Sequence, residues 1–204
     1  MATRGARPQL ARDETAPNDP GHAASAVRAA LRCQQRLGEL NATVEPFKSR
    51  PLGQRIGLNS GEVLVGNIGS RRRFNYTVMG DAVNLASRLE GANKYFGTSI
   101  MASEATVELA GAGFVWRELD WIRVKGRTQP VRIYEPRPEQ TTGTSDYAQG
   151  LDRWRAHDFA GAANCFRRSA ATDPAAAAFL QRVVILIHQP PGPDWEPINT
   201  LDGK

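Results

Sequence analysis

The stretch of sequence that decides the fold runs from Arg55 to Thr106 and reads RIGLNSGEVLVGNIGSRRRFNYTVMGDAVNLASRLEGANKYFGTSIMASEAT. Short β-branched runs alternate in it with glycine-containing turns, and one longer run has the spacing of an amphipathic helix. Asp81 stands where it would cap this helix, because a carboxylate there can accept hydrogen bonds from free N–H groups. The stretch predicts, in order, strands at 54–58 and 62–68 around a turn at 59–61, a basic loop at 71–73, a strand at 74–78, a helix at about 82–95, a strand at 99–101 and a helix at 103–109.

The segments on either side complete this domain. Before it, apolar residues that include Ala26, Cys33 and Leu40 recur at helical spacing, which predicts one amphipathic helix of about five turns. After it, residues 114–124 and 131–134 have the composition of two strands. Helices and strands in this mixed order indicate an α+β domain, in which a sheet carries helices on one face.

The composition is that of an ordinary globular protein. The chain has 204 residues, of which 41% are hydrophobic and 23% charged, enough for one or two cores. The longest aliphatic run, Val183 to Ile187, is far shorter than the roughly 20 apolar residues of a membrane span, and no signal-peptide core is present. The two cysteines lie far apart, which gives no disulfide framework and favours a reducing compartment.

The charge leaves a second class of function open. A net charge of +5 permits an anionic partner such as a nucleotide or a nucleic acid. A nucleic-acid-binding domain would use the basic run Arg71 to Arg73. The sequence carries no RRM, KH or helix-turn-helix signature, so no nucleic-acid partner is expected.

The residues after the last predicted strand differ in composition from the domain before them. Gly150, Ala162, Phe166 and Pro174 have the spacing of a single tetratricopeptide-type unit, whose aromatic residues are expected to pack in a core. Proline-rich and threonine-rich segments flank this unit. The expected organisation is an irregular lead-in at 1–20, a domain at 21–136, a linker at 137–145, tetratricopeptide-like helices at 146–188 and an irregular tail at 189–204.

The stretch Arg55 to Thr106, together with WIRVKGRTQPVRIYE at 121–135, resembles the second half of the class III adenylate and guanylate cyclase catalytic domain. The resemblance implies a ferredoxin-like α+β core, truncated at its N-terminus and followed by a small all-α appendage. It also implies a reaction of intracellular signalling. In that reaction the ribose 3′-oxygen attacks the α-phosphorus of a nucleoside triphosphate, and pyrophosphate leaves.

Two polar residues of the segment VNLASR are candidate catalytic residues. Asn84 and Arg88 are four positions apart, so they share one face of a helix. On spacing alone, a solvated polar pair is the plainer interpretation. The resemblance implies that Asn84 orients the ribose and that Arg88 meets the charge developing on the α-phosphate. It also implies that this pair and the metal-binding aspartates stand on opposite protomers of a head-to-tail dimer.

Two further residues are candidate substrate-binding residues. Thr77 stands seven positions before Asn84, where the family places a residue that contacts the purine edge, and threonine there favours ATP over GTP. Lys125 matches a family lysine that contacts the polyphosphate, and its point charge suits an anion. The plainer interpretations are a β-branched strand residue and a solvated hairpin lysine.

The complete family site holds Mg²⁺ or Mn²⁺ on aspartates that lie upstream of the first helix. Only 20 residues precede Gly21 here, and they contain no such segment, so no metal ligand is nominated. We therefore expect an adenylate cyclase domain that supplies the Asn/Arg half-site in a homodimer or heterodimer and that is inactive alone. The alternative is a degenerate, non-catalytic cyclase-homology module for regulation or dimerisation. Either would be cytoplasmic, by itself or as part of a membrane-anchored parent protein.

Overall fold

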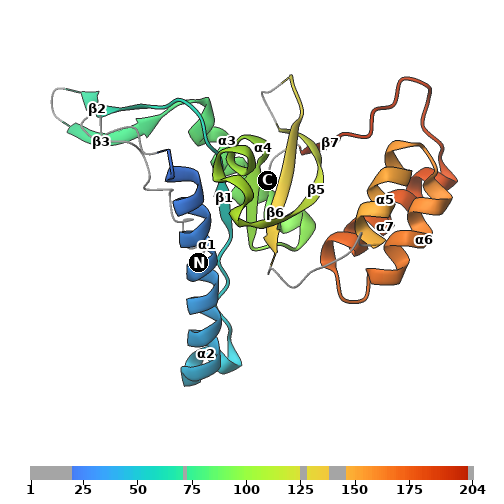
Figure 1. Ribbon diagram of the computed structural model, residues 1–204, viewed down its shortest axis with the longest axis horizontal. Coiled ribbons are helices and arrows are strands. Elements are labelled where there is room, and N and C mark those ends of the chain that lie inside the picture. Colours follow the sequence, from blue (N-terminus) through green and yellow to red (C-terminus); the bar gives the residue numbers. More distant parts are fainter. Residues whose placement is uncertain (1–19, 71–72, 125–127, 138–145, 202–204) are drawn as a thin grey trace.

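The computed structural model describes residues 20–70, 73–124, 128–137 and 146–201 (Figure 1). Several sequence predictions fall outside these residues. They concern the lead-in at 1–19, Arg71 and Arg72 of the basic loop, Lys125 and the linker segment 138–145.

A five-stranded mixed sheet forms the centre of the molecule, in the order β1-β4-β6-β5-β7 (Figure 1). Strand β1 is parallel to β4, β6 is antiparallel to both of its neighbours, and β7 is parallel to β5. The strands are β1 (Ile56–Leu58), β4 (Ile100–Ser103), β5 (Val115–Val124), β6 (Val131–Arg137) and β7 (Asn199–Leu201).

A separate antiparallel pair, which we call the ribbon, extends away from this sheet (Figure 1). It consists of β2 (Leu64–Ser70) and β3 (Arg73–Met79). The turn at 59–61 joins β1 to β2. These two strands do not form a hairpin with each other, because β1 pairs with β4 and β2 pairs with β3.

The predicted helices are present, with boundaries that differ by a few residues. We call α5 to α7 the helical unit. The helices are α1 (His22–Thr43), α2 (Glu45–Ser49), α3 (Asp81–Phe96), α4 (Glu104–Ala110), a 3₁₀ turn at Gly111–Gly113, α5 (Asp146–Arg155), α6 (Phe159–Ser169) and α7 (Pro174–His188). None of the described helices combines the length and the apolar composition that a bilayer crossing requires.

Helices cover both faces of the sheet, whereas the sequence predicted cover on one face. Strand β4 is buried along its whole length. The described residues form two hydrophobic cores. Ile100 and Ala102 belong to the core that also contains residues of α1 and α4, and Met101 belongs to the core that also contains residues of α3 and the helical unit. Because successive residues of a strand point to opposite faces, α1 and α4 lie on one side of β4 and α3 and the helical unit on the other.

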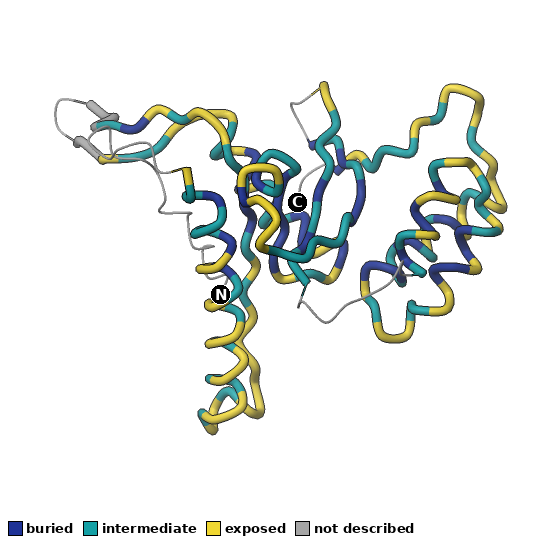
Figure 2. The backbone as a smooth tube through the Cα atoms, in the orientation of Figure 1, coloured by how far each residue is buried: buried dark blue, intermediate teal, exposed yellow. Residues whose placement is uncertain are grey.

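Only the first half of α1 is buried. Ala23, Val27 and Ala30 reach the core, but Cys33 is exposed, and the second half of the helix extends away from the sheet with α2 (Figure 2). The predicted apolar stripe to Leu40 is therefore not buried along its length. The three residues of β1 span only about 10 Å, whereas the 22 residues of α1 span about 33 Å, so β1 cannot cover the whole helix.

The tail is more ordered than its proline content predicts. Trp195 packs against Trp154 of α5, with ring centroids 5.1 Å apart, and the chain then returns to the sheet as β7. Leu201 at the end of β7 is buried. The prediction of an irregular tail was wrong at residues 199–201, which form a strand. Their backbone pairs with β5, and this pairing depends on the position of the helical unit that precedes them.

Candidate active site

Helix α3 carries both candidate catalytic residues. Leu85 and Leu89 are buried in the core, whereas Asn84 is exposed and Arg88 is half-buried. Among the residues described, the side chains of Asn84 and Arg88 have no hydrogen-bond or ion-pair partner. The two side chains are therefore available to a ligand.

The start of α3 differs by one residue from the prediction. Gly80 takes the N-cap position with a φ of 150°, a conformation that favours glycine, and its carbonyl accepts a hydrogen bond from the Asn84 N–H at 3.2 Å. Asp81 is the first residue of the helix itself. Its carboxylate still lies in the first turn, where a negative charge is favourable.

A turn residue, Asn59, fixes the start of α3. Its Nδ2 donates to the carbonyl of Ala82 at 3.0 Å, and its Oδ1 accepts from the Ser103 hydroxyl at 2.6 Å. A Cβ placed on Gly61 would lie 3.0 Å from the Cβ of Ala82, so the turn packs closely on the helix. The sequence predicted Asn59 only as part of a turn, because its partners Ala82 and Ser103 are 23 and 44 positions away.

A buried asparagine holds the second half of α3 on strand β1. Asn93 is fully buried; its Nδ2 donates to the carbonyl of Ile56 at 3.1 Å, and its Oδ1 accepts from the Thr98 hydroxyl at 2.7 Å. Arg55 and Glu90 add an ion pair of 3.2 Å beside it. The signal for Asn93 in the sequence was a polar residue next to the apolar stripe of the helix. Both halves of α3 are therefore anchored, which fixes the place of Arg88.

Thr77 lies on the ribbon, on the strand that leads directly into α3. It pairs with Gly66 of β2, and it shares one face of the ribbon with Leu64 and Met79, because directly paired residues of an antiparallel ladder point the same way. Among the described residues other than its two chain neighbours, none has an atom within 4 Å of the position that a Cβ on Gly66 would take. The face beside Thr77 is therefore open to a planar ligand group.

Two further parts of the predicted site are the polyphosphate contact and the metal ligands. Lys125, the predicted polyphosphate contact, lies outside the described residues. Within the described ranges, no group of three or more His, Cys, Asp or Glu side chains could hold a metal ion.

A protein family matches the part of the chain that carries the site. Residues 10–135 match the family described as "Adenylate and Guanylate cyclase catalytic domain". The match covers more than half of the 204 residues and includes Thr77, Asn84, Arg88 and Lys125. It begins upstream of residue 21, where the sequence predicted the start of the domain.

Similar proteins include two adenylate cyclases. "Adenylate cyclase 1" of Rhizobium meliloti is 40% identical over 117 residues, which are 57% of this chain and 18% of that protein. The terminal-differentiation specific adenylate cyclase of Dictyostelium discoideum is 37% identical over 116 residues, which are 55% of this chain and 5% of that protein. The chain thus spans less than a fifth of the length of these relatives.

Solved structures of cyclases share the fold. The adenylyl cyclase CyaB from P. aeruginosa has a TM-score of 0.52 and 29% identity, over 64% of this chain and 67% of that chain. The guanylyl cyclase Cya2 has a TM-score of 0.50 and 34% identity, over 63% of this chain and 66% of that chain. By sequence and by fold, the chain belongs to the class III adenylate and guanylate cyclase catalytic domain family.

Proposed function

We propose that the chain is an adenylate cyclase domain that supplies Asn84 and Arg88 to an active site shared with a second cyclase domain. One observation carries this proposal. Asn84 and Arg88 are one turn apart on a helix that is anchored at both halves, and yet both side chains lack a partner among the described residues. Donors held in place by their surroundings and left unpaired are suited to meet a ligand.

The two side chains fit the chemistry of the family. In the reaction, the ribose 3′-oxygen attacks the α-phosphorus and negative charge develops on the phosphate oxygens. The Arg88 guanidinium can donate two parallel hydrogen bonds to a phosphate. The Asn84 amide can hold a ribose oxygen so that the 3′-oxygen faces the phosphorus. Positioning and charge stabilisation of this kind supply most of the rate enhancement.

Thr77 supports ATP as the substrate. Its hydroxyl can accept a hydrogen bond from the exocyclic amino group of adenine, and the open face at Gly66 leaves room for the purine. Relatives named adenylate cyclases stand beside a structural neighbour that is named a guanylyl cyclase. GTP is therefore the substrate to test beside ATP.

The ribbon supports a second cyclase domain as the partner. Leu64, Tyr76 and Met79 are 65%, 63% and 50% exposed, which is a large apolar surface for a narrow two-stranded element. By the family resemblance, the carboxylates that bind Mg²⁺ or Mn²⁺ belong to the opposite domain, and Lys125 contacts the polyphosphate. A copy of this chain or another cyclase domain would cover the ribbon. We place this assembly in the cytoplasm. The exposed ribbon also suits the alternative, a non-catalytic dimerisation module.

A mixing experiment tests the proposal. The chain is combined with a class III cyclase domain that keeps its metal-binding carboxylates but has its own helix Asn and Arg replaced by alanine. We expect cyclic AMP from ATP and Mn²⁺ in the mixture and none from either component alone. Arg88→Ala should lower the rate by about 10²-fold or more, since a lost charge-stabilising donor has this effect. Arg167→Ala is the control, because Arg167 is an exposed arginine of the helical unit.

The outcomes separate the two functions. Arg88-dependent synthesis of cyclic AMP supports the half-site. Co-elution of the two folded domains without Arg88-dependent synthesis overturns it and favours the dimerisation module. A higher rate with GTP than with ATP would overturn the adenine preference alone.

A further inference from the structure

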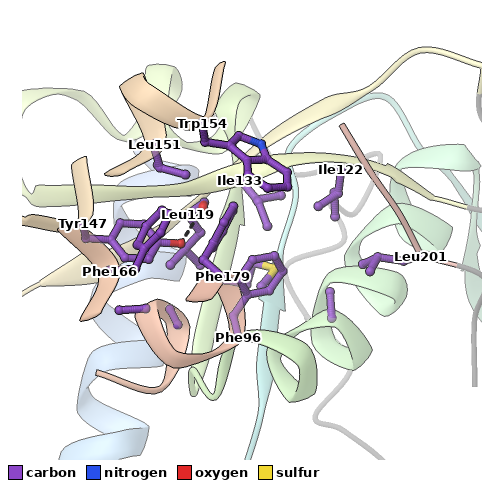
Figure 3. Close-up of a cluster of buried hydrophobic side chains, with 14 of the residues drawn as sticks. Phe96, Leu119, Ile122, Ile133, Tyr147, Leu151, Trp154, Phe166, Phe179 and Leu201 are labelled. Carbon is purple, nitrogen blue, oxygen red and sulfur yellow. Dashed lines mark hydrogen bonds between the residues drawn. The ribbon is translucent and has the colours of Figure 1, made fainter. Parts of the chain in front are cut away.

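The helical unit packs on the same face of the sheet as α3. One hydrophobic cluster contains residues of α3, residues of β5 and β6 and residues from all three helices of the unit (Figure 3). The labelled members from the sheet and α3 are Phe96, Leu119, Ile122, Ile133 and Leu201, and those from the helical unit are Tyr147, Leu151, Trp154, Phe166 and Phe179. The helical unit and the cyclase core therefore share one core.

The C-terminal end of α3 meets the N-terminal end of α7. Helix α3 ends at Gly97, whose φ of 64° is left-handed, and a Cβ on Gly97 would lie only 2.4 Å from the Cβ of Pro174. Next to this contact, the rings of Phe96 in α3 and Phe179 in α7 pack together, with their centroids 6.3 Å apart. The partial negative charge at the end of α3 thus lies beside the partial positive charge at the start of α7.

Asp173 ties this junction to the sheet. Its Oδ1 accepts a hydrogen bond from the Ala175 N–H at 3.1 Å, which caps α7, and its Oδ2 accepts from Arg117 of β5 at 2.5 Å. Arg117 also pairs with Glu135 of β6 at 3.1 Å. The side chains of Asp173, Arg117 and Glu135 are only 15%, 12% and 10% exposed, so water screens these ion pairs weakly.

Further contacts fix the rest of the helical unit on β5. The Tyr147 hydroxyl donates to the carbonyl of Leu119 at 2.7 Å, and Arg182 pairs with Asp120 at 3.2 Å. These contacts hold the helical unit on β5 independently of Asp173, the N-cap residue of α7.

We propose that Asp173 is a positioning residue of the cyclase site, which acts on Arg88 through the junction of α7 and α3. The proposal rests on the function proposed above. Arg88 lies nine residues before Gly97, about 14 Å along the helix, and an α-helix moves largely as a rigid rod. A shift at the end of α3 therefore reaches Arg88, and displacements of about 1 Å at a catalytic group lower rates by up to about 10²-fold. Thr77 stands on the ribbon, which the helical unit does not hold.

The test compares two identical changes within the helical unit of the full chain. Asp173→Asn keeps a good N-cap for α7 but removes the charge that pairs with Arg117. Asp146→Asn is the matched control, because Asp146 pairs with Arg168 on the surface of the unit and makes no contact with the sheet through that pair. The readouts are hydrogen exchange of residues 85–96, and kcat and KM for ATP in the mixed dimer.

We expect Asp173→Asn to raise exchange in residues 85–96, to lower kcat by about 10-fold and to leave KM within about twofold, with Asp146→Asn unchanged in all three. A second variant, Phe179→Leu, alters the ring contact with Phe96 at the same junction and should give the same pattern if Asp173→Asn does not fold. Faster exchange spread evenly over the chain, or kcat and KM equal to those of the Asp146→Asn control, would overturn the positioning role. If the unsubstituted chain gives no Arg88-dependent activity, the proposed function fails, and the exchange of residues 85–96 alone still decides whether Asp173 holds α3.

Discussion

Helix α3 connects two regions that are held in different ways. At its N-terminal end is the ribbon, where Val65 is the one buried residue among the described side chains and Leu64, Tyr76 and Met79 are exposed. At its C-terminal end is the helical unit, whose three helices each contribute a buried aromatic ring to the shared core. The comparison teaches that packing differs along one helix: the packed C-terminal end of α3 lies in the shared core, whereas Asn84 near its N-terminal end is exposed.

The largest effect should come from removing a ring at the packed end. Phe179 is fully buried and its ring contacts those of Phe96, Tyr147 and Trp154. Phe179→Ala should lower the free energy of unfolding by about 3–5 kcal/mol, because it leaves a cavity in a shared core. Tyr76→Ala on the ribbon should change it by less than about 0.5 kcal/mol. Urea denaturation of both variants measures the difference, and equal losses would contradict the comparison.

A second prediction concerns the close approach of α3 to the sheet. A Cβ on Gly57 of β1 would lie 2.2 Å from the Ala86 carbonyl oxygen and 2.3 Å from the Glu90 nitrogen. Gly57→Ala should therefore push α3 away and lower stability by about 3 kcal/mol, at the upper end for overpacking.

Gly66→Ala is the control, because Gly66 is a strand glycine with open space around it. Its effect on the free energy of unfolding should stay within about 0.5 kcal/mol. Thermal unfolding and hydrogen exchange of residues 82–96 report both effects, and a Gly57→Ala chain as stable as Gly66→Ala would show that α3 is not tightly seated.

The smallest effect depends on pH and compares two carboxyl groups. Burial raises the pKa of Asp120 to about 6, although Arg182 and the Trp121 N–H act in the opposite direction. The folded chain therefore binds more protons at Asp120 than the unfolded chain between about pH 4 and pH 6. The raised pKa of Asp120 therefore adds to the free energy of unfolding fully below about pH 4. This contribution, on the order of 2–3 kcal/mol, is lost as the pH rises through about 6.

The difference in unfolding free energy between the wild-type chain and Asp120→Asn should accordingly decrease from pH 4 to pH 7. The hydrogen bonds of Arg168 lower the pKa of the exposed Asp146 carboxyl, so Asp146→Asn should show the opposite sign: wild-type stability relative to the variant falls as the pH falls. Denaturation series at several pH values measure both slopes. Parallel slopes for the two variants would refute the assignment of opposite environments.

The sequence by itself determined the elements whose bonds are local. Helix α3 was predicted at about 82–95 and runs from Asp81 to Phe96, because apolar spacing and the Gly97 end act within a few residues. The placement of Asn84 and Arg88 on one face follows from the same helical period. The family resemblance likewise depends on contiguous motifs of the sequence, and the family match confirms it.

Only the tertiary structure decided which elements meet. Asp173 and Arg117 are 56 positions apart, and β7 reaches β5 after the chain has crossed the helical unit, so no local pattern encodes either contact. Asn59 and Asn93 became anchors of α3 because buried amides must find partners wherever the fold places them. The physical reason is the range of the interactions: hydrogen bonds within a helix join residues four positions apart, whereas strand partners and buried ion pairs depend on how all layers pack together.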